Sequence, residues 1–134
     1  MKTFLGVAAG LTLLLGVVWV FLPQTMLSSW GVQADPITVY MGRRYGGLFF
    51  GYAAILWLAK ATGPSPARTA VLAGSAIVTS VMAIVSLVGV LSGVVGPAVW
   101  GALVLEALLA TGFVYYYAKA RQLPTPSPPS ARGG

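Results

Sequence analysis

Four long apolar segments follow one another along the chain, separated by short polar or proline-containing stretches. The first runs over residues 4–22 without a charge, close to the roughly 20 residues that a helix needs to cross a bilayer. The others cover residues 36–61, 67–91 and 97–120. This pattern predicts an all-α fold, an integral membrane bundle of four transmembrane helices that occupies residues 1–121.

Helix start signals support these boundaries. Asp35 directly precedes Pro36, which is the arrangement of an N-cap acceptor followed by proline in the first helical turn. Ser65 and Pro66 repeat it, and Pro97 is expected to open the last helix. The remaining residues, 122–134 (QLPTPSPPSARGG), are rich in proline and small polar residues, so we expect a disordered tail.

Composition agrees with a membrane location. The 134 residues are 57% hydrophobic and 7% charged, whereas a soluble domain carries about 25% charged residues. In a soluble chain the net charge of +6 would suggest a nucleic-acid partner. In a membrane protein basic residues are more simply topology signals, so we expect the lipid bilayer as partner and no nucleic acid.

The first apolar segment has an alternative interpretation as a signal peptide, because Lys2 precedes it and Val32-Gln33-Ala34 resembles a small-residue cleavage site. Two features favour its retention as a helix. The apolar run is longer than the 7–15 residues typical of a signal core, and the Val-Gln-Ala triplet lies well beyond its end, after Trp30.

The distribution of basic residues predicts the orientation. With four crossings, the N-terminus, the connection between helices two and three and the C-terminus share one side of the membrane. That side carries Lys2, Lys60, Arg68, Lys119, Arg121 and Arg132. The positive-inside rule therefore predicts a multi-pass protein of the cell (inner) membrane with both termini in the cytoplasm.

Three charged residues lie well inside the predicted helices, away from the helix ends. Arg43 and Arg44 lie about two turns into the second helix, and Glu106 lies within the fourth. A charge at a helix centre costs about 2.5–3.5 kcal/mol on insertion scales. At 1.5 Å per residue, Arg44 lies about 24 Å above Lys60 and Glu106 about 20 Å above Lys119. The similar depth makes an intramembrane ion pair between an arginine and Glu106 the leading hypothesis.

Other interpretations of these charges stay open. Glu106 is alternatively protonated and bonded to a backbone carbonyl, or faces a partner subunit. One arginine is expected to extend to the lipid headgroups, as arginines near helix ends often do. The pattern does not decide whether Arg43 or Arg44 pairs with Glu106.

Small and polar residues predict the packing faces. Gly47 and Gly51 fall on one seam with Arg44 and form a GxxxG pair, as Gly6 and Gly10 do in the first helix. Such pairs let helix backbones approach closely in lipid. A stripe in the third helix is also expected to face the bundle, and its polar members are Ser75, Thr79 and Ser86. Tryptophans and tyrosines near the segment ends, Trp19 and Trp30 among them, are expected at the membrane interface.

Together these features resemble the DoxX-like and related uncharacterised four-helix membrane proteins of bacteria. The resemblance rests on a first helix ending at Pro23, then Trp30-Gly31, Asp35, the arginines with Gly46-Gly47 and Gly51, and Glu106. It covers residues 4–120, and the spacing ahead of Gly46-Gly47 matches the family arginine to Arg43. The resemblance implies the fold more than an activity, although some DoxX-like members are associated with quinone-linked or redox membrane systems.

No catalytic, cofactor-binding or metal-binding residues are predicted. The chain has no Cys and no His, and metal catalysis needs several convergent ligands. We therefore expect no enzyme and no cofactor. The favoured function is an accessory or structural four-helix bundle subunit, held together by the Arg–Glu pair, that binds another membrane protein or a second copy of itself. The alternative is a protein that binds or transports a lipophilic small molecule in a charged, outward-facing cavity.

Overall fold

A computed structural model describes residues 1–122, and these residues form five α-helices and no strand. The predicted all-α class is confirmed. The helices are α1 (Lys2–Phe21), α2 (Pro23–Ser29), α3 (Pro36–Ala61), α4 (Pro66–Leu91) and α5 (Val99–Arg121). The predicted disordered tail lies outside the described residues, apart from Gln122.

Two helix starts follow the predicted cap-then-proline arrangement. The carboxylate of Asp35 accepts hydrogen bonds from the backbone N–H groups of Ile37 (2.8 Å) and Thr38 (2.9 Å). The Thr38 N–H contributes most to holding the pKa of Asp35 below its ordinary value. At the start of α4, the Ser65 hydroxyl accepts from the N–H of Arg68 at 3.2 Å.

Two boundaries differ from the prediction. The first apolar segment ends at Phe21, and Pro23 opens the short helix α2, which the hydrophobic pattern does not predict. Proline lacks an N–H and cannot continue the preceding helix, but it suits the first position of a new one. Pro97 was expected to open the last helix, but α5 begins two residues later, at Val99. A tighter turn with i→i−3 hydrogen bonds precedes it (Trp100 N to Pro97 O, 3.1 Å).

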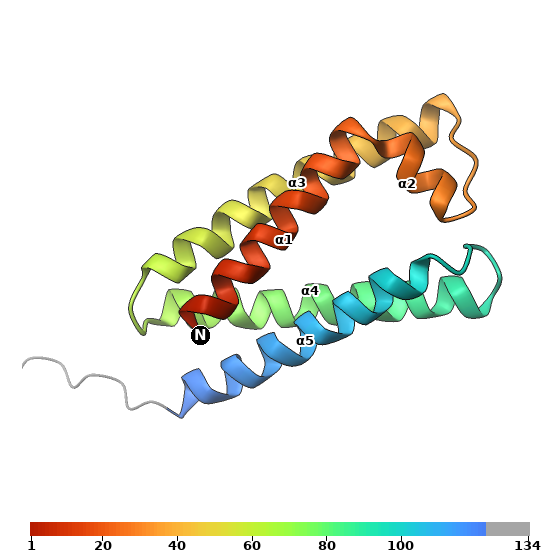
Figure 1. The fold of residues 1–134 in the computed structure, drawn as a ribbon. Helices are drawn as coiled ribbons and strands as arrows, with labels where there is room; N and C mark the ends of the chain where they lie inside the picture. The colour runs from red at the N-terminus through yellow and green to blue at the C-terminus, as the bar shows by residue number, and fades with distance from the viewer. Residues whose placement is uncertain (123–134) are drawn as a thin grey trace, which may run out of the picture.

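The helices are arranged as two pairs (Figure 1). α1 packs mainly against α3, and α4 packs mainly against α5. The pairs converge at what we call the closed end, which contains the start of α1, residues 62–65 and the end of α5. The opposite, open end contains α2, residues 30–35 and the connection over residues 92–98.

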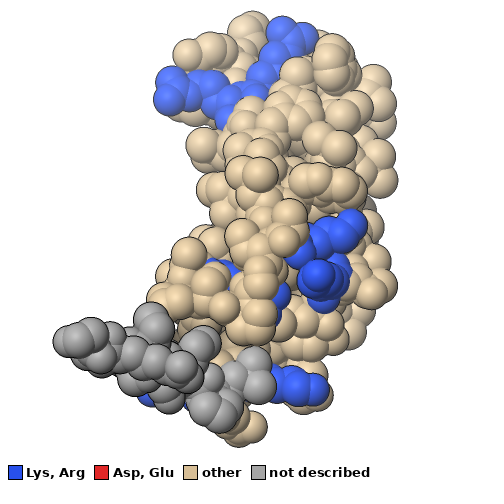
Figure 2. All heavy atoms as spheres, turned by 90° about the vertical axis from the view of Figure 1, so that its left-hand side faces the viewer, with Lys and Arg blue, Asp and Glu red and all other residues tan. Residues whose placement is uncertain are grey.

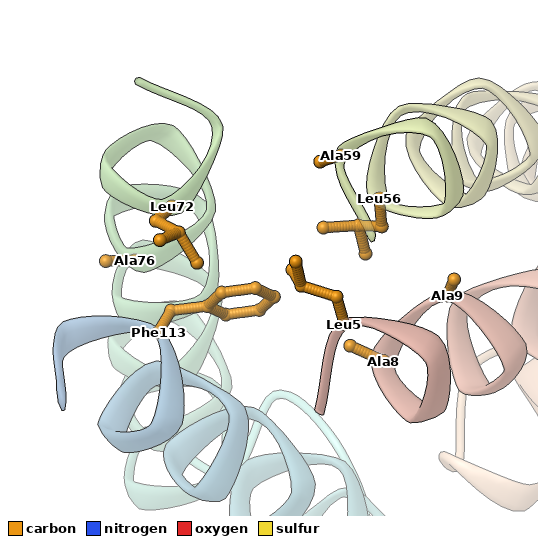
Figure 3. Packing of buried hydrophobic residues seen from close by; sticks show 8 residues of the cluster. All are labelled: Leu5, Ala8, Ala9, Leu56, Ala59, Leu72, Ala76 and Phe113. Atoms are coloured by element: carbon orange, nitrogen blue, oxygen red, sulfur yellow. The ribbon is translucent and has the colours of Figure 1, made fainter. Parts of the chain in front are cut away.

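A hydrophobic core joins the two pairs at the closed end. Side chains from α1, α3, α4 and α5 point toward one another there (Figure 3). The core residues are Leu5, Ala8, Ala9, Leu56, Ala59, Leu72, Ala76 and Phe113. The ring of Phe4 packs beside it, 5.0 Å from the Phe113 ring centroid in an edge-to-face arrangement. Because α1 contributes three core residues, the folded bundle includes the first helix.

The close approach of α1 and α3 depends on Gly46 and not on the predicted seam. A Cβ on Gly46 would lie 2.8 Å from Trp19 Cβ and 2.9 Å from the backbone nitrogen of Val20. Gly47 and Gly51 are exposed, and nothing lies within 4 Å of a Cβ on either. The seam through Gly47 and Gly51 was therefore placed on the wrong side of the helix.

The GxxxG pair predicted in α1 is also not a contact between helix backbones. A Cβ on Gly10 would meet nothing within 4 Å, and one on Gly6 would lie 3.1 Å from Nζ of Lys60. Gly6 therefore accommodates a lysine side chain from α3. Closer to the open end, Gly16 approaches α3 directly, since its Cβ would lie 3.2 Å from the carbonyl oxygen of Gly46.

Three helices, α1, α4 and α5, are long and apolar enough to cross a membrane, judged by length and composition. The prediction of four such helices is therefore met for three. α3 is as long as α4, but it carries Arg43, Arg44 and Lys60, and these charges lower its hydropathy.

Candidate functional site

Glu106 does not contact the arginines that were its predicted partners. Its Oε2 accepts a hydrogen bond of 2.7 Å from the hydroxyl of Ser86 on α4. Arg43 and Arg44 are exposed, and the guanidinium of Arg44 instead reaches the hydroxyl of Tyr40 at 3.4 Å. Within residues 1–122 the predicted Arg–Glu ion pair is therefore replaced by a Ser–Glu hydrogen bond.

The physical reason is the rotation of α3 about its axis. Successive residues of a helix point about 100° apart, so neighbouring positions at one depth face different surroundings. The arginines lie on the exposed side of α3, whereas Tyr45 turns toward the α4–α5 pair and donates its hydroxyl hydrogen to Sδ of Met82 at 3.6 Å. The rise per residue places α3 and Glu106 at a similar depth, but it does not determine which α3 side chain faces the α4–α5 pair.

A cavity of about 600 Å³ lies between the two helix pairs. All five helices or their ends contribute to its wall. The lining residues are Thr12, Leu15, Trp19, Met26, Ser29, Trp30, Tyr45, Leu48, Phe49, Tyr52, Val78, Thr79, Met82, Ala98, Gly101, Ala102, Leu105, Glu106 and Leu109. Most of these side chains are apolar or aromatic, and Glu106 is the charged one. Both the volume and this lining are typical of sites that bind small molecules.

One wall of the cavity is a continuous row of aromatic rings. Trp19 packs edge-to-face against Trp30 (centroids 5.1 Å apart) and against Tyr45 (5.6 Å), and Tyr45 packs against Phe49 (4.8 Å). The sequence placed both tryptophans at the membrane interface. Trp19 is instead 4% exposed, so it serves as an internal wall that links α1 to α2 and α3.

The polar stripe of α4 lies on the side that faces the other helices. Ser75 and Thr79 are buried, and Ser86 holds Glu106. The Thr79 hydroxyl donates to the backbone carbonyl of Ser75 at 2.8 Å. The Ser75 Oγ and Tyr52 Oη atoms are buried without a hydrogen-bond partner in the described residues. Of this stripe, Thr79 lines the cavity, and Ser86 reaches it only through the hydrogen bond to Glu106.

Backbone contacts connect the two helix pairs at the open end. The N–H of Gly96 donates to the carbonyl oxygen of Trp30 at 2.6 Å. A Cβ on Gly96 would lie 3.2 Å from that oxygen. Glycine at this position lets the connection over residues 92–98 rest against residues 30 and 31, which ties the α4–α5 pair to α2 beyond the cavity.

The described part of the site contains no cluster of metal-ligating side chains. Over residues 1–122, no group of three or more His, Cys, Asp or Glu side chains is placed to hold a metal ion. What the cavity offers chemically is apolar volume, aromatic faces and one carboxylate. Sequence reasoning singled out Glu106 and Ser86, but it missed the Trp19–Trp30–Tyr45–Phe49 wall, whose rings come from segments far apart in the chain.

No curated protein and no solved structure matches the chain. A family model, described as a domain of unknown function (DUF8292), matches residues 1–118. These residues include all of α1–α4 and α5 up to the last three of its residues, so the match covers the whole cavity. The chain belongs to the DUF8292 family.

Proposed function

We propose that this protein is a multi-pass membrane protein that binds a lipophilic small molecule between its two helix pairs. The observation that carries the proposal is the cavity of about 600 Å³, with apolar and aromatic walls and a single carboxylate, Glu106. A cavity in a membrane bundle is open to molecules that partition into lipid. The accessory-subunit hypothesis and the DoxX-like relationship stay predictions, and the former loses the Arg–Glu pair on which it was based.

Four membrane crossings fit this proposal, with α3 as the fourth. α3 packs along α1, and its 26 residues extend about 39 Å, so a bilayer crossed by α1 is crossed by α3 as well. Arg43 and Arg44 lie on its exposed side, near enough to the open end for their guanidinium groups to reach the headgroups.

Charge supports a cytoplasmic closed end. Viewed from that end, Lys and Arg atoms gather in the lower half of the molecule and again near its upper edge, away from the closed end, and no Asp or Glu atoms are visible (Figure 2). The basic residues of the described closed end are Lys2, Lys60, Arg68, Lys119 and Arg121. By the positive-inside rule, α2 and residues 92–98 then lie on the outer side.

Single cysteines test this orientation, because the chain contains none of its own. Gln33→Cys at the open end is expected to react with an impermeant thiol reagent added to intact cells, whereas Gly63→Cys at the closed end reacts only after the cells are lysed. Both positions are exposed. Labelling of Gly63→Cys in intact cells, with Gln33→Cys protected, would reverse the orientation.

A cavity-filling pair of variants tests the binding function. Gly101 lines the cavity, and a Cβ there would meet nothing within 4 Å, so Gly101→Phe is expected to occupy the site without disturbing the fold. Gly74→Phe is the matched control, because Gly74 is equally free of neighbours but does not line the cavity. The measurement is titration of the purified protein with the neutral fluorophore N-phenyl-1-naphthylamine.

We expect Gly101→Phe to weaken fluorophore binding by at least about tenfold, which corresponds to about 1.4 kcal/mol, and Gly74→Phe to bind as the unmodified protein does. Equal binding by the two variants would place the fluorophore elsewhere and contradict the proposed site.

A further inference from the structure

The charge balance of the cavity points to the class of its ligand. Resting on the binding function proposed above, we infer that the cavity takes a lipophilic organic monocation, with the cationic centre between the Glu106 carboxylate and the aromatic wall. Three features of the cavity support this ligand class: its carboxylate, its aromatic wall and its apolar lining.

The first feature is the unbalanced carboxylate. Among the described residues that line the cavity, Glu106 is the one acidic residue and none is basic. Its Oε2 is bonded to Ser86, and a hydroxyl donor is neutral, so it stabilises the carboxylate without cancelling its charge. A charge at this depth of a membrane helix is costly unless it is paired. A cationic ligand supplies the missing counter-charge.

The second feature is the aromatic wall. Trp19, Trp30 and Tyr45 line the same cavity as Glu106, and they come from α1, the end of α2 and α3. The face of an aromatic ring attracts a cation through its quadrupole, most strongly for tryptophan and where water is excluded. A carboxylate on α5 and several rings on the other helices are suited to an organic cation and unsuited to an anion.

The third feature is the apolar remainder of the wall. Side chains such as Leu15, Val78, Leu105 and Leu109 supply it, and they offer nothing to a hydrated inorganic ion, which would have to exchange its water for hydrocarbon. The ligand must therefore cover its charge with apolar groups, as a substituted ammonium or phosphonium does. One carboxylate limits it to a single positive charge.

Two ions of the same shape and opposite charge test the inference. Tetraphenylphosphonium and tetraphenylborate are each used to displace N-phenyl-1-naphthylamine from the purified protein in one detergent. In the unmodified protein the phosphonium is expected to displace the fluorophore at about tenfold lower concentration than the borate. Glu106→Gln, which keeps the shape and removes the charge, is expected to abolish this preference, measured as the ratio of the displacing concentrations of the two ions for the same variant.

Ser86→Ala is the companion variant, because it keeps the carboxylate and removes only its hydrogen bond. It is expected to retain the preference for the cation. This result would show that the preference depends on the charge of Glu106 and not on its hydrogen bond to Ser86. If the fluorophore binds in the cavity but the two ions displace it equally, or if Glu106→Gln keeps the preference, the inference is overturned and the binding function stands. If Gly101→Phe leaves fluorophore binding intact, that result contradicts the proposed binding function itself, independently of any preference between the two ions.

Discussion

A Gly46→Leu variant is expected to lose about 3 kcal/mol of folding free energy, at the upper end of the range for an overpacked core. The cause is a close contact between two helices. A Cβ at position 46 would lie within 2.9 Å of both a side-chain atom and the backbone nitrogen of Val20 on α1. A backbone atom cannot turn away, so α1 and α3 must separate along much of their contact. Thermal unfolding in detergent measures the loss.

Gly47→Leu is the matched control for this prediction. The two glycines are adjacent in α3, yet a Cβ on Gly47 would meet nothing within 4 Å. Its replacement is expected to leave the melting temperature unchanged or raise it slightly, because glycine is a poor helix former. Equal losses at the two positions would show that α3 is rotated differently against α1.

Phe113→Ala is expected to destabilise the protein by about 3 kcal/mol. This is the low end of the range for truncating a core phenylalanine in soluble proteins, because lipid also solvates apolar side chains and the loss is mainly one of packing. The Phe113 ring is fully buried among core residues of α1, α3 and α4 (Figure 3). Its removal leaves a void where the two pairs are joined.

Val114→Ala provides the comparison, since Val114 is the next residue on α5 and is 51% exposed. Unfolding of both variants under the same detergent conditions is expected to show a small change for Val114→Ala and a large one for Phe113→Ala. If Phe113→Ala unfolds as the unmodified protein does, the closed-end core does not hold the pairs together.

Local signals in the sequence predicted where most helices begin. Asp35-Pro36 and Ser65-Pro66 are capping arrangements that act over three or four residues, and both helices start at the proline. The short helix α2 was missed, because seven residues are too few to show a helical period. The similar depth of Glu106 and Arg44 was also inferred from local information, because the estimate needs only the rise per residue along each helix.

The orientation of each helix about its own axis was harder to predict. α3 is apolar or glycine-rich on nearly all sides, so the pairs Gly42–Gly46 and Gly47–Gly51 fit the small-residue pattern equally well. Only packing against Trp19 and Val20 of α1 selects the first pair. The same rotation turns Tyr45 inward, where it bonds Met82, and the arginines outward, so neither arginine contacts Glu106, which is held by Ser86 of α4.

Photo-crosslinking with a neutral, photoreactive lipophile, followed by peptide mass spectrometry, tests the central claim that the space between the helix pairs is a ligand site. We predict adducts on cavity-lining residues from both pairs, such as Phe49 on α3 and Leu105 on α5, and their loss on competition with the unlabelled compound. Exposed apolar residues outside the cavity, such as Ile84 and Leu108 (61% and 66% exposed), are expected to show only labelling that competition does not reduce. Adducts spread evenly over both sets, with no competition at Phe49 or Leu105, would contradict the account.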